Sequence, residues 1–119
     1  MADAGQYTID YQPLLGALQK LEVQRLIDDT TEPWSNQTLC QIGDTVVRLG
    51  VMQGEFHWHK HDEQDELFLV LDGLFRIEVE DRPTIELGPR DAYLVPRGVR
   101  HRPIAPIRTA SSWSNKPTS

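Results

Sequence analysis

From residue 37 onward, short apolar segments alternate with turn residues, and this pattern constrains the fold more than any other feature of the sequence. Residues 74–80 alternate apolar and polar side chains, and Asp72-Gly73 before them is typical of a hairpin turn. About seven such segments at near-regular spacing favour an all-β sandwich or barrel. The expected strands cover residues 45–52, 56–61, 66–71, 74–80, 84–87, 92–95 and 99–104.

The two ends of the chain differ from this middle part. Residues 13–27 place leucines at helical spacing behind Pro13, which predicts an amphipathic helix, although residues 23–27 could instead begin a strand. A length of 119 residues indicates one domain. We therefore expect an N-terminal extension with a helix over residues 1–36, a barrel over 37–108 and a polar tail over 109–119, which either completes a strand pair or frays.

Charge and composition exclude several classes of function. The 18 acidic and 12 basic residues give a net charge of -6, which disfavours binding to nucleic acid or to an anionic membrane surface. No apolar run approaches the roughly 18 residues of a membrane span, and the N-terminus lacks the pattern of a signal peptide. The single cysteine, Cys40, fits a reducing compartment. We expect a cytoplasmic protein in which Arg97 forms an ion pair instead of binding a substrate carboxylate.

His59-Lys60-His61 is the pattern with the clearest chemistry. On a strand, residues i and i+2 share a face about 7 Å apart, so both imidazoles can converge on one ion. Glu66 follows after a short turn and can lie beside them on the next strand. Two ring nitrogens and one carboxylate on one side of an ion leave coordination positions open, as catalytic metal sites do. The same residues could also be hydrogen-bonded polar groups with no ion between them, and His57 shares their expected face.

The spacing of these residues resembles the first motif of the cupin superfamily. In this sequence it reads His59-x-His61-x4-Glu66-x6-Gly73. The resemblance is closest to small one-domain, RmlC-like cupins that are often labelled as of the mannose-6-phosphate-isomerase type. It implies a mainly β fold, a single jelly-roll barrel with a short N-terminal helical segment.

Pro96-x-Gly98-x2-His101 resembles the second cupin motif, and the resemblance implies that His101 is the fourth metal ligand. Two positions differ from the family's pattern. Arg90 stands where a glycine usually precedes the acidic residue, and Ala105 stands where an asparagine often follows the histidine. Neither position supplies a metal ligand.

The resemblance implies one divalent ion, Zn, Fe, Mn, Ni, Co or Cu, in an enzyme acting on a small oxygen-rich metabolite. Related cupins include dioxygenases, decarboxylases, isomerases and lyases. His57, Tyr93 or a hydroxide on the ion would transfer the proton. The alternatives are a non-catalytic module that binds a sugar or a small acid, and a metal-free protein that uses its barrel only for assembly. Small cupins commonly pair, so we expect a homodimer.

Overall fold

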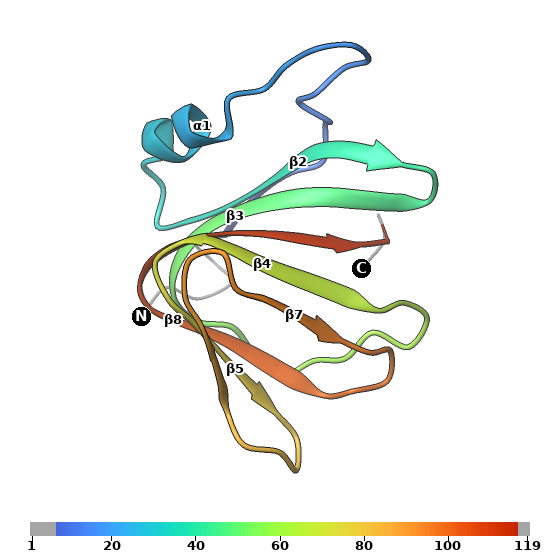
Figure 1. The fold of residues 1–119 in the computed structure, drawn as a ribbon, viewed down its shortest axis with the longest axis vertical. Helices are drawn as coiled ribbons and strands as arrows, with labels where there is room; N and C mark the ends of the chain where they lie inside the picture. Colours follow the sequence, from blue (N-terminus) through green and yellow to red (C-terminus); the bar gives the residue numbers. More distant parts are fainter. Residues whose placement is uncertain (1–6, 117–119) are drawn as a thin grey trace.

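The longest strand, β8 (His101–Asn115), holds the β-structure together because it pairs with β3, β4 and β5. The computed structural model describes residues 7–116. Figure 1 shows β8 bent at the left of the view into a first arm, residues 101–105, and a second arm, residues 109–115, so that one strand contributes to both layers of the barrel. The elements are β1 (Tyr7–Asp10), α1 (Val23–Asp29), β2 (Trp34–Ile42), β3 (Thr45–Glu55), β4 (Glu66–Asp72), β5 (Phe75–Val79), β6 (Ile85–Leu87), β7 (Ala92–Val95) and β8.

The strands form one sheet in the order β1-β2-β3-β8-β4-β7, and β5 and β6 extend it from the first arm of β8. All of these pairs are antiparallel except β1 with β2. This confirms the expected mainly β, jelly-roll type of barrel. The barrel interior holds the larger apolar cluster, as alternation along β4 and β5 predicts. Its members include Phe68, Val70, Phe75, Ile77 and Val95.

The predicted helix over residues 13–27 is largely wrong, because α1 begins only at Val23. The preceding segment instead runs beside β2, where Leu14 and Leu15 donate backbone hydrogen bonds to Thr38 and Leu39. Leu18 adopts a positive φ of 60° and its side chain is fully exposed. Leucine spacing alone could not reveal this, because short helices depend on tertiary packing more than on propensity.

Helix α1 covers the outer face of the sheet, beside β2 and β3 in Figure 1. Ile27 packs there against Leu39, Leu49 and Val51, in a second apolar cluster outside the barrel. Helix α1 and this second cluster cover only one part of the outer face of the sheet. Among residues 7–116 the seven-residue α1 is the sole helix, and the structure contains no helix able to cross a membrane.

Two other segments differ from the expected strands. Residues 56–61 form no regular strand, and their only ladder contact is an isolated bridge between His59 and His101. The last expected strand, over 99–104, is the first part of β8, which continues through the polar residues to Asn115. The sheet thus extends beyond residues 37–108 at both ends, since β2 begins at Trp34.

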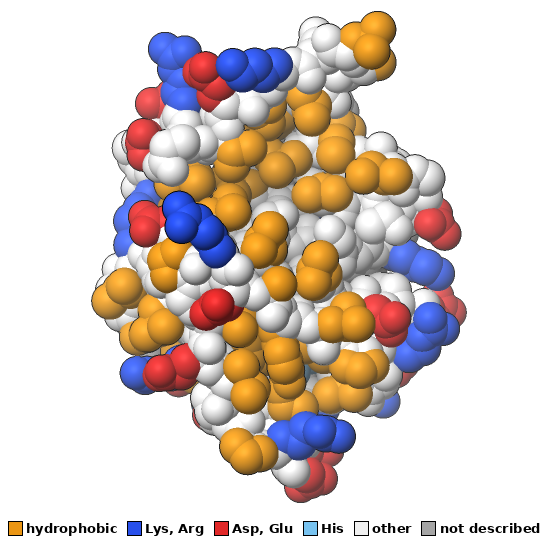
Figure 2. Space-filling model, in the orientation of Figure 1, with side chains coloured by type: hydrophobic (Ala, Val, Ile, Leu, Met, Phe, Trp, Pro, Cys, Tyr) orange, Lys and Arg blue, Asp and Glu red, His pale blue; other side chains and the backbone are white. Residues whose placement is uncertain are grey.

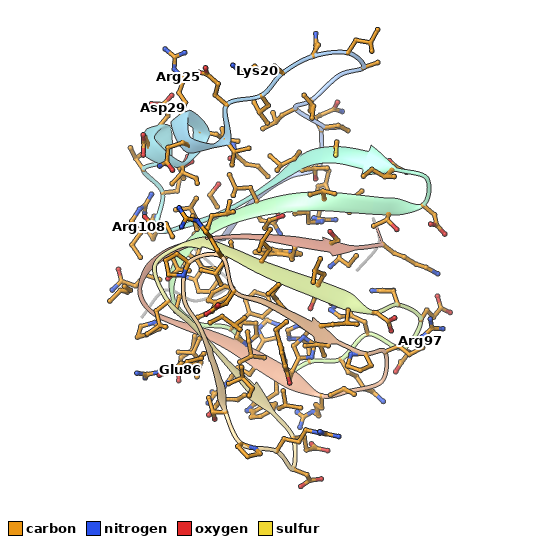
Figure 3. All side chains as sticks on the ribbon, viewed as in Figure 1. Lys20, Arg25, Asp29, Glu86, Arg97 and Arg108 are labelled. Atoms are coloured by element: carbon orange, nitrogen blue, oxygen red, sulfur yellow. The ribbon has the colours of Figure 1, made fainter. Side chains whose placement is uncertain are left out.

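Charged side chains lie around the outside of this scaffold (Figure 3). Lys20, Arg25 and Asp29 lie near α1, and Arg97 lies at the right of the view, in the loop between β7 and β8. Arg97 donates its backbone N–H to Asp65, and its guanidinium lies 3.6 Å from the same carboxylate. The expected ion pair of Arg97 is therefore confirmed.

Candidate metal centre

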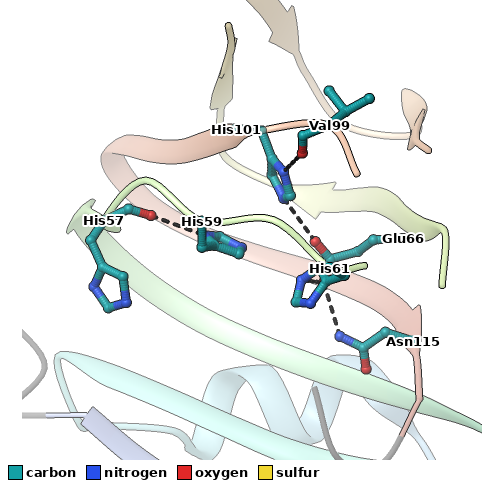
Figure 4. Close-up of polar contacts among 7 residues, drawn as sticks. All are labelled: His57, His59, His61, Glu66, Val99, His101 and Asn115. Atoms are coloured by element: carbon teal, nitrogen blue, oxygen red, sulfur yellow. Dashed lines mark hydrogen bonds and ion pairs between the residues drawn. The ribbon is translucent and has the colours of Figure 1, made fainter. Parts of the chain in front are cut away.

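Four side chains from three parts of the chain converge at one end of the barrel (Figure 4). His59 and His61 come from the segment between β3 and β4, Glu66 is the first residue of β4, and His101 is the first residue of β8. Each residue offers one potential ligand atom, a ring nitrogen or a carboxylate oxygen, and these four atoms all lie within 4.8 Å of one another. We call these residues the four-residue cluster.

Backbone carbonyls orient two of the imidazoles. His59 Nδ1 donates to the carbonyl oxygen of His57 at 2.8 Å, and His101 Nδ1 donates to that of Val99 at 2.9 Å. A carbonyl only accepts hydrogen bonds, so the proton of each neutral ring lies on Nδ1. A neutral ring with its proton on Nδ1 keeps a lone pair on Nε2, which is the state that binds a metal.

Glu66 connects the histidines. Its Oε1 lies 3.0 Å from His101 Nε2, and its Oε2 lies 3.4 Å from His61 Nε2. Burial alone would raise the pKa of Glu66, but the contacts with His101 and His61 outweigh it and lower the pKa to about 2. The carboxylate is therefore ionised at neutral pH although the residue is only 5% exposed.

The pKa values of His59 and His61 are shifted in opposite directions by their surroundings. Burial lowers the pKa of His59 and outweighs the opposing effect of its bond to His57. The contact with Glu66 raises the pKa of His61 and outweighs desolvation. A divalent ion would replace these proton-mediated contacts, because metal ligands bind in their deprotonated forms.

Two further features of the four-residue cluster fit a metal ion. His61 Nε2 is buried and makes no hydrogen bond of acceptable geometry. His101 has both ring nitrogens against acceptors, Val99 O and Glu66 Oε1, although a neutral imidazole carries only one N–H. A cation between these side chains would bind both His61 Nε2 and His101 Nε2. Mixed imidazole and carboxylate ligands suit Zn and other first-row transition metals.

The four-residue cluster forms part of the wall of a cavity of about 540 Å³. The opposite wall comes from β2 and β3, through Trp34, Asn36, Arg48 and Met52. Trp113 and Asn115 complete it from the second arm of β8. An ion at the four-residue cluster would therefore face a space large enough for a small organic molecule.

The two predicted proton-transfer residues lie in different surroundings. His57 lines the cavity, but its exposed ring points away from the other imidazoles in Figure 4. It stacks on Phe56 with ring centroids 4.6 Å apart. Tyr93 lies on β7 opposite Phe68, packs against the interior apolar cluster and is not part of the cavity lining. The structure thus places only His57 next to the cavity.

Asn115 is a site residue that sequence reasoning missed. Its Nδ2 donates a 2.9 Å hydrogen bond to Glu66 Oε2, so it holds the carboxylate on the side away from His101. The one available signal was its two-residue spacing from Trp113, which places both side chains on one face of a strand. The polar composition around it concealed that strand.

Residues 45–112, which include the whole four-residue cluster, match the cupin domain family. The chain belongs to this family. The cupin is 36% identical over 86 residues to the uncharacterized protein YdbB of Bacillus subtilis (strain 168), which covers 72% of this chain and 76% of that protein.

Solved cupin structures share this fold. A cupin-2 domain protein from Shewanella frigidimarina aligns over 81% of this cupin and 93% of its own chain, with a TM-score of 0.75 and 27% identity. Hydroquinone 1,2-dioxygenase from Sphingomonas sp. TTNP3 aligns over 84% of this cupin but only 32% of its own chain, with a TM-score of 0.74. At 16% identity that second likeness shows the fold alone.

Proposed function

We propose that this cupin is a metal-dependent enzyme that acts on a small, oxygen-rich molecule bound in the cavity. The observation that carries the proposal is the four-residue cluster itself, whose ligand atoms lie within 4.8 Å of one another in the cavity wall. A divalent ion held there by His59, His61, Glu66 and His101 would supply Lewis-acid chemistry to a substrate oxygen. Dioxygenase, isomerase, decarboxylase and lyase reactions all fit this arrangement.

The protein's own groups have separate tasks in this proposal. The carbonyls of His57 and Val99 fix the rings of His59 and His101, and Asn115 fixes Glu66. The His57 imidazole lies between the cavity and solvent, and we assign it the transfer of a proton to or from the substrate. Tyr93 stays a second, sequence-based candidate for that role.

Elemental analysis tests the metal site directly. The protein is purified without chelator or affinity-tag metal, and the wild type is compared with His59→Ala and His57→Ala. We expect near-stoichiometric metal in the wild type and in His57→Ala, because His57 contributes only its backbone carbonyl to the cluster. We expect a severe loss in His59→Ala. No metal in the folded wild type, or equal loss in both variants, would contradict the assignment.

The second candidate is a module that binds a sugar or a small acid without converting it. The observation that favours it is the exposed position of His57, whose ring points away from the four-residue cluster. Product analysis separates the two candidates. An enzyme releases product over many turnovers, whereas the module returns its ligand unchanged, with the metal still bound.

The protein's partners form a further part of the proposal. The outer face of β4 and β7 exposes Leu67, Leu69 and Leu94, and Leu67 pairs directly with Leu94. Figure 2 shows hydrophobic side chains gathered over the face on which β4 and β7 lie in Figure 1. Such a patch marks an interaction surface, and we assign it to a homodimer. Sedimentation of the wild type against Leu94→Asp tests this, and a monomeric wild type would contradict it.

The half-buried, free Cys40 and the negative net charge support a cytoplasmic protein without a nucleic-acid partner.

A further inference from the structure

The cavity contains a buried positive charge that metal binding does not use. Arg48 lies on β3 and lines the cavity, although the residue is only 3% exposed. A guanidinium is planar and binds a carboxylate through two parallel hydrogen bonds. We propose that the cavity binds a small organic carboxylate and that Arg48 contacts the carboxylate group. This deepens the proposed function and rests on it, because it names the substrate class of the same site.

The strand register places Arg48 close to the four-residue cluster. Arg48 pairs with Trp113 on β8, and Val46, two residues earlier on β3, pairs with Asn115. Arg48 and Asn115 are therefore diagonal neighbours on one face of the sheet, about 7–8 Å apart. Asn115 in turn contacts Glu66. A short molecule could thus reach the metal ligands with one end and Arg48 with the other.

The surfaces between these two points are largely aromatic. Trp34, Phe56 and Trp113 line the cavity together with Tyr11, whose ring lies 5.5 Å below the Arg48 guanidinium carbon. Flat aromatic walls suit a planar or apolar ligand body. The guanidinium has five N–H donors, so Arg48 can keep its contacts within the protein and still bind a carboxylate.

The charged residues of the cavity lining differ in burial, and the acidic Asp62 and Glu63 are exposed. Lys60, the other basic residue of the lining, is exposed and lies 3.4 Å from Asp62 at the rim. Glu66 is engaged by two histidines. Among the charged residues of the described lining, Arg48 is the buried one outside the four-residue cluster. A charge in such a low-dielectric wall interacts more strongly with a bound ion than a charge in water does.

Paired carboxylates and amides provide the test. Benzoate against benzamide, and acetate against acetamide, are titrated into the metal-loaded wild type while tryptophan fluorescence and heat are recorded. The carboxylate of at least one pair should bind about tenfold or more tightly than its amide. This comparison needs no variant, so it does not depend on whether a change at buried Arg48 is tolerated. Equal affinity within both pairs would overturn the proposal.

Three variants then locate the preference at Arg48. Arg48→Met should remove the preference for the carboxylate over the amide, and Arg48→Lys should retain part of this preference. Arg97→Met is the matched control, because Arg97 lies outside the cavity against Asp65. A preference that survives in a folded Arg48→Met protein would overturn the assignment to Arg48, and would place the anion on the metal ion.

Metal content is measured on each sample, and the titrations are repeated on metal-free protein. Absence of metal from the wild type would contradict the proposed function alone, since the carboxylate preference is still measured. Normal metal content with no carboxylate preference would contradict only the proposal that the cavity binds a carboxylate at Arg48. The two failures are therefore distinguishable.

Discussion

Asn115 and Glu66 are joined by a 2.9 Å hydrogen bond from Nδ2 to Oε2, across a sequence separation of 49 residues. Both residues are almost completely buried. The bond occupies one carboxylate oxygen from the side of β8, while His101 contacts the other oxygen. The amide thus restricts how Glu66 can turn toward an ion.

Replacing this amide should weaken metal binding without emptying the site. We expect Asn115→Ala to lower metal affinity by about 10- to 100-fold, because groups that orient a ligand contribute that much in other metal sites. Competition with a chelating dye measures the affinity. Ser114→Ala is the control, since Ser114 pairs with Leu67 and belongs to the opposite face of β8. Equal affinities in the two variants would show that Asn115 does not position Glu66.

The acid sensitivity of the metal-free protein should depend on Glu66. Its pKa falls from 4.5 to about 2 on folding, so its stabilising contribution is present above pH 4.5 and is lost as the pH falls toward 2. The full contribution is on the order of 3 kcal/mol. Denaturant unfolding of the wild type and Glu66→Gln should differ most above about pH 5 and converge below it. A constant difference over this range would contradict the prediction, and Glu63→Gln, at an exposed neighbour, is the control.

Arg90 is a site of backbone strain that a glycine would relieve. Its φ is +71°, in the left-handed region, and its side chain is exposed. Such a conformation costs a non-glycine residue about 1–2 kcal/mol. Because glycine also gains entropy in the unfolded chain, we expect Arg90→Gly to raise the free energy of unfolding by only about 0.5–1 kcal/mol. Arg90→Ala should change it little, and a glycine variant no more stable than the alanine variant would contradict the strain.

Gly50 makes room for Trp113 in the cavity wall. A Cβ at this position would lie 2.3 Å from both the Met52 methyl group and the Trp113 ring. We expect Gly50→Ala to destabilise the protein by about 1–3 kcal/mol, as overpacking does, and to shift the tryptophan emission because the ring must move. Gly88→Ala should do neither, since its nearest contact would be at 3.7 Å. Unchanged stability and emission in Gly50→Ala would show that the ring yields freely.

Short spacing predicted that His59, His61 and Glu66 would lie together, although residues 56–61 do not form the strand that this prediction assumed. Only the resemblance to the second cupin motif added His101. Glu66 begins β4 as expected, and the bridge between His59 and His101 brings the two motifs together. The alternation expected around His57 failed, since a single bridge does not impose strand geometry on its neighbours. His57 therefore turns away from the other rings.

The sequence left open whether the second arm of β8 completes a strand pair, which it does, and gave Arg48 no role in the site, both for a shared reason. Strand prediction assumes that the inward face is apolar, yet here that face lines a cavity in which polar side chains stand among aromatic ones. Ser111, Trp113 and Asn115 share that face, and the small residues Ala110 and Ser112 lie on the other. Neither face gives an apolar stripe, so the segment resembles a tail. Arg48 likewise appears as a surface residue within an apolar strand until the register places it beside Trp113.

The double role of β8 determines when the metal centre can assemble. Its first residue, His101, and its last, Asn115, contact Glu66 across 35 and 49 residues of sequence. Contacts between such distant residues form late and slowly during folding. A slip of β8 by one residue would turn Asn115 to the opposite face of the sheet. The affinity of this cluster for an ion would therefore report whether the last strand has joined the barrel in its correct register.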